Sequence, residues 1–101
     1  ARLILQTARD TEMKSLPHHV QQYSKSPVFT EETVPKGLLK DHNTKSGVWG
    51  LICVNEGELE YIIEDKEKHI LSPESKGVVE PEIKHHIKPV GTVSFFIEFY
   101  K

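Results

Sequence analysis

The sequence predicts a small single-domain all-β protein, an antiparallel sandwich or barrel with little helix. Three observations predict this class: runs of β-branched and aromatic residues, alternation of apolar and polar side chains with a period of two, and turn residues roughly every 8–12 positions. The chain has 101 residues, the size of one domain, and its 37% hydrophobic content is enough for one modest core.

The first part of the chain has weak patterns. Residues 1–25 are expected to form an N-terminal extension, in which 4–14 favour a short helix and 3–6 alternatively favour an edge strand. Three prolines then interrupt regular structure, because each removes a backbone donor. Between them only short strands fit, at residues 20–23 and 28–30, followed by a turn at 35–37.

The strongest strand signal lies in the middle of the chain. Residues 48–54 are β-branched and aromatic, and residues 55–57 end in a glycine that favours a turn. Residues 58–64 then alternate, with one apolar face (Leu59, Tyr61, Ile63) and one acidic face (Glu58, Glu60, Glu64). The sequence therefore predicts a β-hairpin here.

The remaining strands are short, apart from the last. After a charged turn at 65–68, strands are predicted at 69–71, 77–80 and 83–87, and proline follows two of them. A turn at 90–92 precedes a final strand at 93–100, in which Val93, Phe95, Ile97 and Phe99 share one face. The total is seven to nine short strands.

Composition excludes several classes of protein. The net charge of −2 argues against a duplex-DNA binder, and no apolar run approaches the ~20 residues of a membrane span. The one cysteine, Cys53, cannot form an internal disulfide and is predicted to be buried in its apolar strand. We expect a cytoplasmic protein that binds neither nucleic acid nor membrane.

Six histidines are the main candidates for chemistry. His42 precedes the strong strand, while His85 and His86 follow the corner at Glu80-Pro81. Neutral imidazoles and a carboxylate that converge suit a divalent transition metal such as Zn, Ni, Fe or Mn. Neighbouring residues of a strand point to opposite faces, so at most one of His85 and His86 faces inward.

Other residues are expected to be structural. His18, His19 and His69 are predicted to be exposed. The aromatic residues are expected to be core rather than a stacking platform, and no motif identifies a catalytic residue. Lys45, Trp49 and Tyr61 are nevertheless named as the candidates for contacting a small ligand.

Several short motifs together resemble a known family. They are Pro35-x-Gly-Leu-Leu, the segment from His42 through Asn43-Thr44-Lys45 to Gly47-Val48-Trp49-Gly50, Gly57-x-Leu59-x-Tyr61, Val79-Glu80-Pro81-x3-His85, and the closing Glu98-Phe99-Tyr100. The combination, over residues 26–101, is similar to the TehB-like, cupin-related domain, which in some relatives precedes a methyltransferase that confers tellurite resistance. The resemblance implies a cupin-like barrel, a double-sheet jelly roll, without implying methyltransferase activity for this chain.

The resemblance also implies a metal set of His42, Glu80 and His85. Compared with typical cupins, Thr44 stands where a second histidine is usual and Ile83 replaces a glycine. Counting from Pro81 as in typical cupins selects His86, whereas the TehB-like pattern selects His85.

Three functions follow as hypotheses. The first is a binding module for a small anion, such as an oxyanion, or a metal, formed by His42, Lys45, Glu80 and His85. The second is a small metal-dependent enzyme in which Glu80 is a ligand or general base. The third is a structural or interaction domain that pairs as a homodimer through an exposed sheet.

Overall fold

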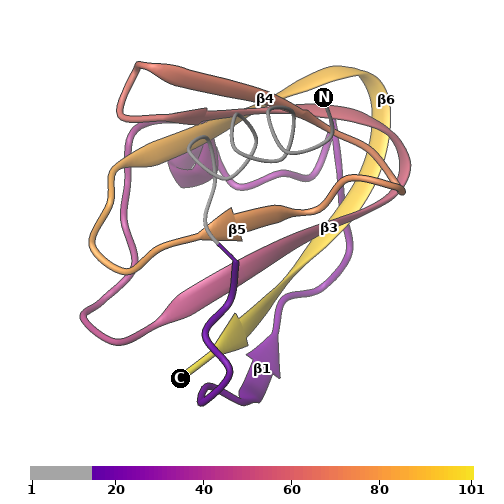
Figure 1. Cartoon of the computed structure of the whole chain (residues 1–101). Helices are drawn as coiled ribbons and strands as arrows, with labels where there is room; N and C mark the ends of the chain where they lie inside the picture. Colours follow the sequence, from indigo (N-terminus) through magenta and orange to yellow (C-terminus); the bar gives the residue numbers. More distant parts are fainter. Residues whose placement is uncertain (1–14) are drawn as a thin grey trace, which may run out of the picture.

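The two longest strands, β3 (Trp49–Ile63) and β6 (His85–Tyr100), pair with each other and form the centre of the fold (Figure 1). The structure is a computed structural model that describes residues 15–101. The antiparallel pairing runs from Trp49 opposite Tyr100 to Ile63 opposite His85. β-branched and aromatic side chains fill both strands, as expected for residues that pack on a pleated surface.

A sharp bend divides this pair of strands in the middle. The register shifts on both sides of Glu56, and the glycines at the bend, Gly57 and Gly91, have positive φ values of 81° and 67°. The predicted turns at 55–57 and 90–92 are therefore wrong. Each is a β-bulge inside a continuous strand, because the glycine bends a strand that stays paired with its partner.

Four shorter strands complete the sheet on both sides of the central pair. β1 (Gln22–Lys25) and β2 (Phe29–Thr30) pair with β6, while β4 (Glu67–Leu71) and β5 (Gly77–Val79) pair with β3. The strand order is β1-β6-β3-β4. All pairings are antiparallel, which confirms the predicted all-β class.

The sheet is open rather than closed into a barrel. Its pairing path begins at β1 and ends at β4, and within residues 15–101 no pairing joins these two strands. The prediction of a closed barrel is therefore wrong, because no strand pairing closes the described sheet. Six strands occur in the described chain instead of seven to nine, because residues predicted as separate strands are continuous in β3 and β6.

The bend folds the sheet over on itself, so that both halves contribute to one core. The expected faces are confirmed: Leu59, Tyr61, Val93 and Phe95 are each at most 1% exposed. The cluster of buried residues also contains Ile52, Val54, Leu71, Val79, Ile87 and Ile97. Cys53 is buried too, at 6% exposure, as predicted.

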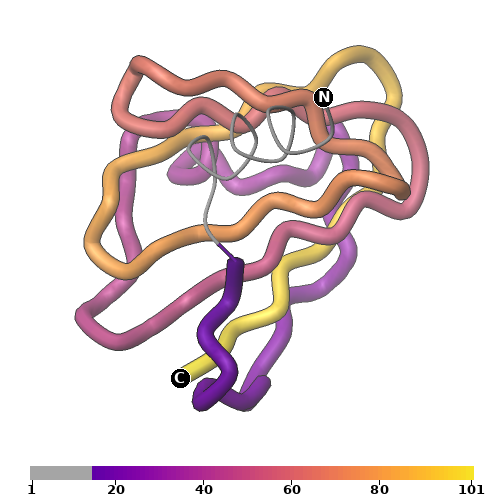
Figure 2. The backbone as a smooth tube through the Cα atoms, viewed as in Figure 1, coloured from indigo at the N-terminus to yellow at the C-terminus, as the bar shows by residue number. Residues whose placement is uncertain are grey.

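Hydrogen bonds join parts of the chain that are far apart in sequence. The Tyr61 hydroxyl donates to the Val78 carbonyl oxygen at 2.8 Å, which connects the second half of β3 to β5. Gln21 and Lys101 exchange main-chain hydrogen bonds of 3.1 Å, so the end of the chain lies beside the segment that leads into β1 (Figure 2). The helix or strand predicted within residues 3–14 lies outside the described residues.

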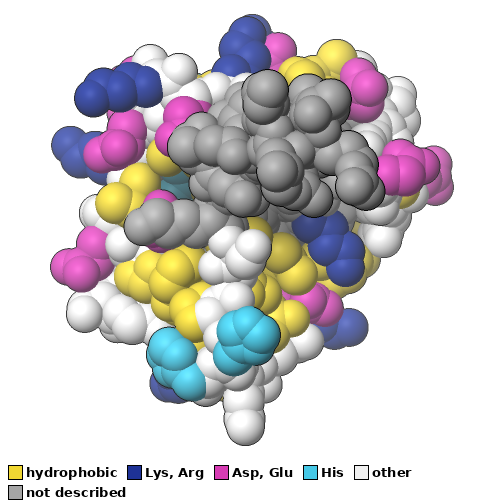
Figure 3. All heavy atoms as spheres, in the orientation of Figure 1, with side chains coloured by type: hydrophobic (Ala, Val, Ile, Leu, Met, Phe, Trp, Pro, Cys, Tyr) yellow, Lys and Arg dark blue, Asp and Glu magenta, His cyan; other side chains and the backbone are white. Residues whose placement is uncertain are grey.

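One short 3-10 helix, η1 (Lys36–Leu39), replaces the turn predicted at 35–37. It follows Pro35 and packs against β6, where its Leu38 contacts the core. On the face shown in Figure 3, charged side chains of both signs are interspersed around a hydrophobic area.

Candidate functional site: a histidine pair beside an apolar cavity

The backbone of His42 is hydrogen-bonded to the backbone of His85. Each residue donates its N–H to the carbonyl oxygen of the other at 2.9 Å, an isolated antiparallel bridge. His85 is the first residue of β6, whereas His42 lies in the irregular segment between η1 and β3. This bridge therefore fixes a loop residue against a strand.

The two imidazole rings of the bridge lie side by side. Their centroids are 4.2 Å apart, and the edge of the Tyr61 ring meets His85 at 5.7 Å. His85 is only 4% exposed, and His42 is half-buried. Residues opposed in an antiparallel bridge point to the same side, so the main chain itself places both rings on one face of the sheet.

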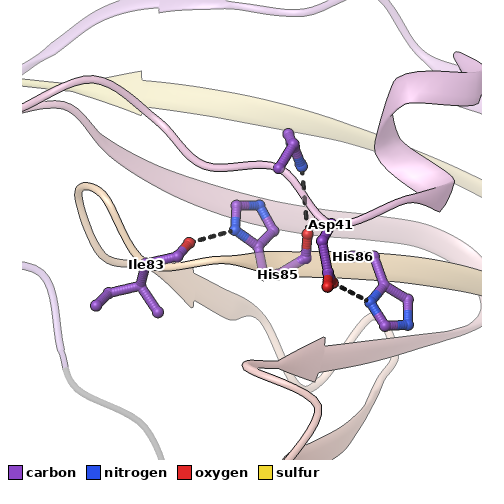
Figure 4. Close-up of polar contacts among 5 residues, drawn as sticks. Asp41, Ile83, His85 and His86 are labelled. Carbon is purple, nitrogen blue, oxygen red and sulfur yellow. Dashed lines mark hydrogen bonds and ion pairs between the residues drawn. The ribbon is translucent and has the colours of Figure 1, made fainter.

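Hydrogen bonds define the tautomer of His85. Its Nδ1 lies 3.0 Å from the carbonyl oxygen of Ile83 (Figure 4). A carbonyl oxygen only accepts, so Nδ1 carries the proton and Nε2 keeps its lone pair. His42 follows the same rule, with Nδ1 3.4 Å from the carbonyl oxygen of His85.

Burial makes both imidazoles weak bases. Desolvation lowers the pKa of His85 below its usual 6.5, and the neighbouring His42 and His86 lower it further. The hydrogen bond to Ile83 and the charge of Asp41 oppose this shift. Desolvation also lowers the pKa of His42. Both rings are therefore neutral at pH 7, the form in which imidazole binds metals.

A small cavity of about 50 Å³ adjoins the pair. Apolar residues from β3, β5, β6 and η1 make most of its wall, namely Leu38, Gly50, Ile52, Val79, Ile87, Ile97 and Phe99. The polar residues that line it are His42, His85 and Thr44, and the Thr44 hydroxyl already donates to the Val48 carbonyl at 2.7 Å. The two imidazoles are thus the polar groups that this cavity offers to a ligand.

The other predicted site residues lie apart from this cavity. Tyr61 contacts His85, but its hydroxyl is bonded to Val78. Glu80 is half-buried after β5 and does not line the cavity. Lys45 is exposed and lines a different groove, which shares only Thr44 and Phe99 with the cavity wall. Trp49 is half-buried and, by alternation, lies on the opposite face of β3 from Gly50.

The reverse face of the same bridge carries a second polar group. His86 Nδ1 and Asp41 Oδ1 are 2.9 Å apart (Figure 4). The carboxylate of Asp65 lies within 4.8 Å of both. In the described chain these are the three potential metal ligands whose atoms all lie within 4.8 Å of one another. The sequence analysis assigned no role to Asp41 and Asp65. Neighbouring residues alternate between faces, so Asp41 lies on the face opposite His42, just as His86 lies opposite His85. This alternation could have predicted from the sequence that Asp41 and His86 share a face.

Two surface predictions have different outcomes. His18 and His19 are exposed, as expected. His69 was predicted to be exposed but is half-buried, since it stands opposite Tyr61 in β4 and bonds to Glu67 at 3.2 Å. No helix within residues 15–101 is long and apolar enough to cross a membrane.

The fold and the site define a small all-β domain with a neutral histidine pair on the wall of an apolar cavity. The chain belongs to the TehB-like domain family, whose model matches residues 24–97. The resemblance noted in the sequence is thereby confirmed.

TehB of Haemophilus influenzae is similar to this chain in sequence and in structure. The probable S-adenosyl-L-methionine-dependent methyltransferase TehB of Haemophilus influenzae is 38% identical over 39 residues, which are 39% of this chain and 14% of that protein. The crystal structure of Haemophilus influenzae TehB superposes with a TM-score of 0.75 at 30% identity, over 82% of this chain and 32% of that one. This chain therefore spans less than a third of TehB.

A structure of similar size gives the same fold. A structural-genomics crystal structure of a protein from Escherichia coli K12 superposes with a TM-score of 0.79 at 22% identity. The match covers 88% of this chain and 97% of that one, so it extends over almost the whole of the other protein.

Proposed function

We propose that this domain binds a divalent transition-metal ion through His42 and His85. The observation that carries the proposal is the reciprocal backbone bridge, which places two neutral imidazoles side by side on the wall of a cavity. Neutral imidazole suits Zn, Ni and Fe, and each ring here keeps an Nε2 lone pair. Rings whose centres are 4.2 Å apart can share one ion after small side-chain rotations.

The surroundings of the pair favour an open metal site. Two protein ligands leave positions for water or for a small-molecule ligand, and a cavity of about 50 Å³ has room for an ion with a few waters. The hydrogen bond from His85 to the Ile83 carbonyl would orient that imidazole, as second-shell partners do in metal sites. An inward rotation of Glu80 would be needed to add the carboxylate of the predicted set.

A metal explains the site better than a directly bound anion. An anion needs positive charge, whereas burial keeps both imidazoles neutral and Lys45 lines another groove. The family is linked to tellurite resistance, and we propose that an oxyanion would bind here as a further ligand of the metal. We propose that the fold is of the cupin type, with this cavity holding the metal and its further ligand.

Cobalt binding tests the proposal directly. Untagged protein is titrated with Co²⁺ while visible absorption is recorded, because the d–d bands report ligand type and coordination number. We expect one equivalent to bind, with affinity lost at least tenfold in His42→Ala and in His85→Gln, while circular dichroism shows an intact sheet.

The matched controls lie on the reverse face of the bridge. His86→Gln and Asp65→Asn remove ligands of the outer group without touching the cavity, so binding should survive both changes. Loss of binding in these variants, with retention in His42→Ala, would assign the metal to Asp41, Asp65 and His86 and overturn the proposal. Absence of binding to the unmodified protein would overturn it as well.

A further inference from the structure

A second, larger hollow lies next to the histidine cavity. This groove, of about 320 Å³, is lined by Phe29, Pro35, Leu38, Phe99 and four further residues, Ser26, Gly37, His42 and Ile97. Four of its lining residues also line the inner cavity: Leu38, His42, Ile97 and Phe99. The groove and the cavity are therefore neighbouring compartments with a common wall.

The common wall is mostly apolar. Leu38, Ile97 and Phe99 form it together with one polar residue, His42. Ile97 is 9% exposed, whereas Leu38 and Phe99 are half-buried. A ligand that extends from the groove toward the imidazoles would thus pass three hydrophobic side chains.

Leu38 is the part of the wall with the least support. It belongs to η1, a four-residue 3-10 helix whose N-terminal end has no side-chain cap and none of whose residues is fully buried. Phe99 and Ile97, in contrast, belong to β6, the longest strand in the described chain. A modest movement of η1 would therefore open a passage between groove and cavity without disturbing the sheet.

We infer that the site takes a small amphiphilic molecule, with an oxygen-donor head such as a carboxylate at the His42–His85 metal and a short apolar body in the groove. The inference rests on the proposed metal site and adds the class of ligand. A hydrated ion alone gains nothing from apolar walls, whereas each buried methylene raises affinity by about three- to fourfold. A pocket with apolar walls and a few convergent polar groups is the usual form of a small-molecule site.

A series of linear carboxylates tests the ligand class. Co²⁺-loaded protein is titrated with formate, acetate, butyrate and hexanoate, and the visible bands report binding at the metal. We expect affinity to rise about threefold per methylene as the chain enters the groove. Equal affinity for formate and hexanoate would overturn the inference while leaving the metal site intact.

Two variants locate the apolar body. In Gly37→Trp the new ring fills the groove from a position that does not line the inner cavity and where an added Cβ meets nothing within 4 Å. Hexanoate should therefore lose its advantage while cobalt and formate still bind. The matched control is Ile70→Trp, which places the same ring at an exposed position of β4 and should leave the series unchanged. A preserved chain-length dependence in Gly37→Trp would place the apolar body elsewhere and overturn the inference.

Metal-free protein separates the two proposals. Hexanol has the apolar body without a metal-binding carboxylate, and amide chemical shifts report where it binds. We expect shift changes at Phe29, Leu38 and Phe99 that are absent in Gly37→Trp, whether or not cobalt binds. Failure of cobalt binding with these shifts present would overturn the metal proposal and the head-group contact while leaving the apolar subsite, and absence of the shifts would overturn the apolar subsite.

Discussion

His42 and His85 are 43 positions apart in sequence, yet each accepts a main-chain hydrogen bond from the other at 2.9 Å. The reverse face of the same bridge holds the contact between Asp41 and His86. Two short segments thus carry a buried neutral pair on one face and an exposed polar pair on the other. The protonation and packing of the buried pair give the first prediction.

Stability should fall as the pH drops below the usual histidine pKa of 6.5. Burial lowers the folded-state pKa of both His42 and His85, so near pH 6 the unfolded chain binds more protons than the folded protein. The stabilisation is complete above about pH 6.5 and is lost as the pH falls through the folded-state values. Urea unfolding between pH 8 and pH 5 measures this slope.

The variant His85→Gln should flatten that pH dependence, because one of the two buried titrating groups is gone. His18→Gln, at an exposed position outside the site, serves as the control and should keep the slope of the unmodified protein. Parallel profiles for His85→Gln and the unmodified protein would mean that His85 does not titrate as its burial requires.

Metal binding should show a matching pH dependence. Protons compete with the metal for the Nε2 lone pairs, so cobalt affinity should decrease as the pH is lowered toward and below the folded-state pKa values. Titrations at pH 8, 7 and 6 measure the change. An affinity that rises at lower pH would instead indicate a site that needs cationic imidazole, as direct binding of an anion would.

The two glycines of the bend should differ in their tolerance of alanine. A Cβ at Gly57 would collide with the Thr92 carbonyl oxygen, whereas a Cβ at Gly91 meets nothing within 4 Å. Both positions have positive φ, so both variants carry a backbone cost of about 1 kcal/mol. Gly57→Ala should be destabilised by several kcal/mol more, as measured by chemical unfolding. Equal losses of unfolding free energy in the two variants would show that the backbone at the bend shifts to accommodate the added Cβ.

Tyr61→Phe should cost about 1 to 1.5 kcal/mol of unfolding free energy. The change removes the 2.8 Å hydrogen bond to the Val78 carbonyl from a residue that is 1% exposed. Tyr100→Phe is the matched control, because its hydroxyl donates to Glu98 in a half-buried position, and it should cost less than about 0.5 kcal/mol. Similar losses of unfolding free energy in both variants would show that the Tyr61 hydrogen bond stabilises the fold no more than the Tyr100 hydrogen bond does.

Cys53 should react with Ellman's reagent only when the protein unfolds. Its side chain is 6% exposed, and burial raises the pKa of the thiol, which reduces the reactive thiolate. The labelling rate at pH 8 should therefore increase with added denaturant in parallel with the fraction of unfolded protein. Rapid labelling of the native protein would show that β3 opens locally at this position.

The sequence predicted local patterns better than their connections. Leu59 and Tyr61 are buried as their alternation requires, and so are Val93 and Phe95. The residues around Gly57 were misinterpreted as a hairpin turn because a turn and a bulge both use glycine at positive φ. The choice between them depends on the partner strand β6, more than 30 positions away, which no local pattern specifies.

The site was predictable only in part. The period-two alternation allowed only one of His85 and His86 to face inward. The family resemblance favoured His85, which lines the cavity. The separation of Glu80 from this cavity could not be read from sequence, because the direction of a side chain after a corner depends on the corner's geometry. Asp65 joins His86 only through the turn between β3 and β4.

The central position of β6 also determines when the protein can fold. This strand, His85–Tyr100, is synthesised after the five other described strands, yet β1, β2 and β3 all pair with it. The full sheet cannot form in a nascent chain until β6 has left the ribosome, so the edges of β1, β2 and β3 that β6 covers stay unpaired until then. Sheets held by such distant contacts fold slowly, typically in milliseconds to seconds, and during that time exposed strands are vulnerable to aggregation.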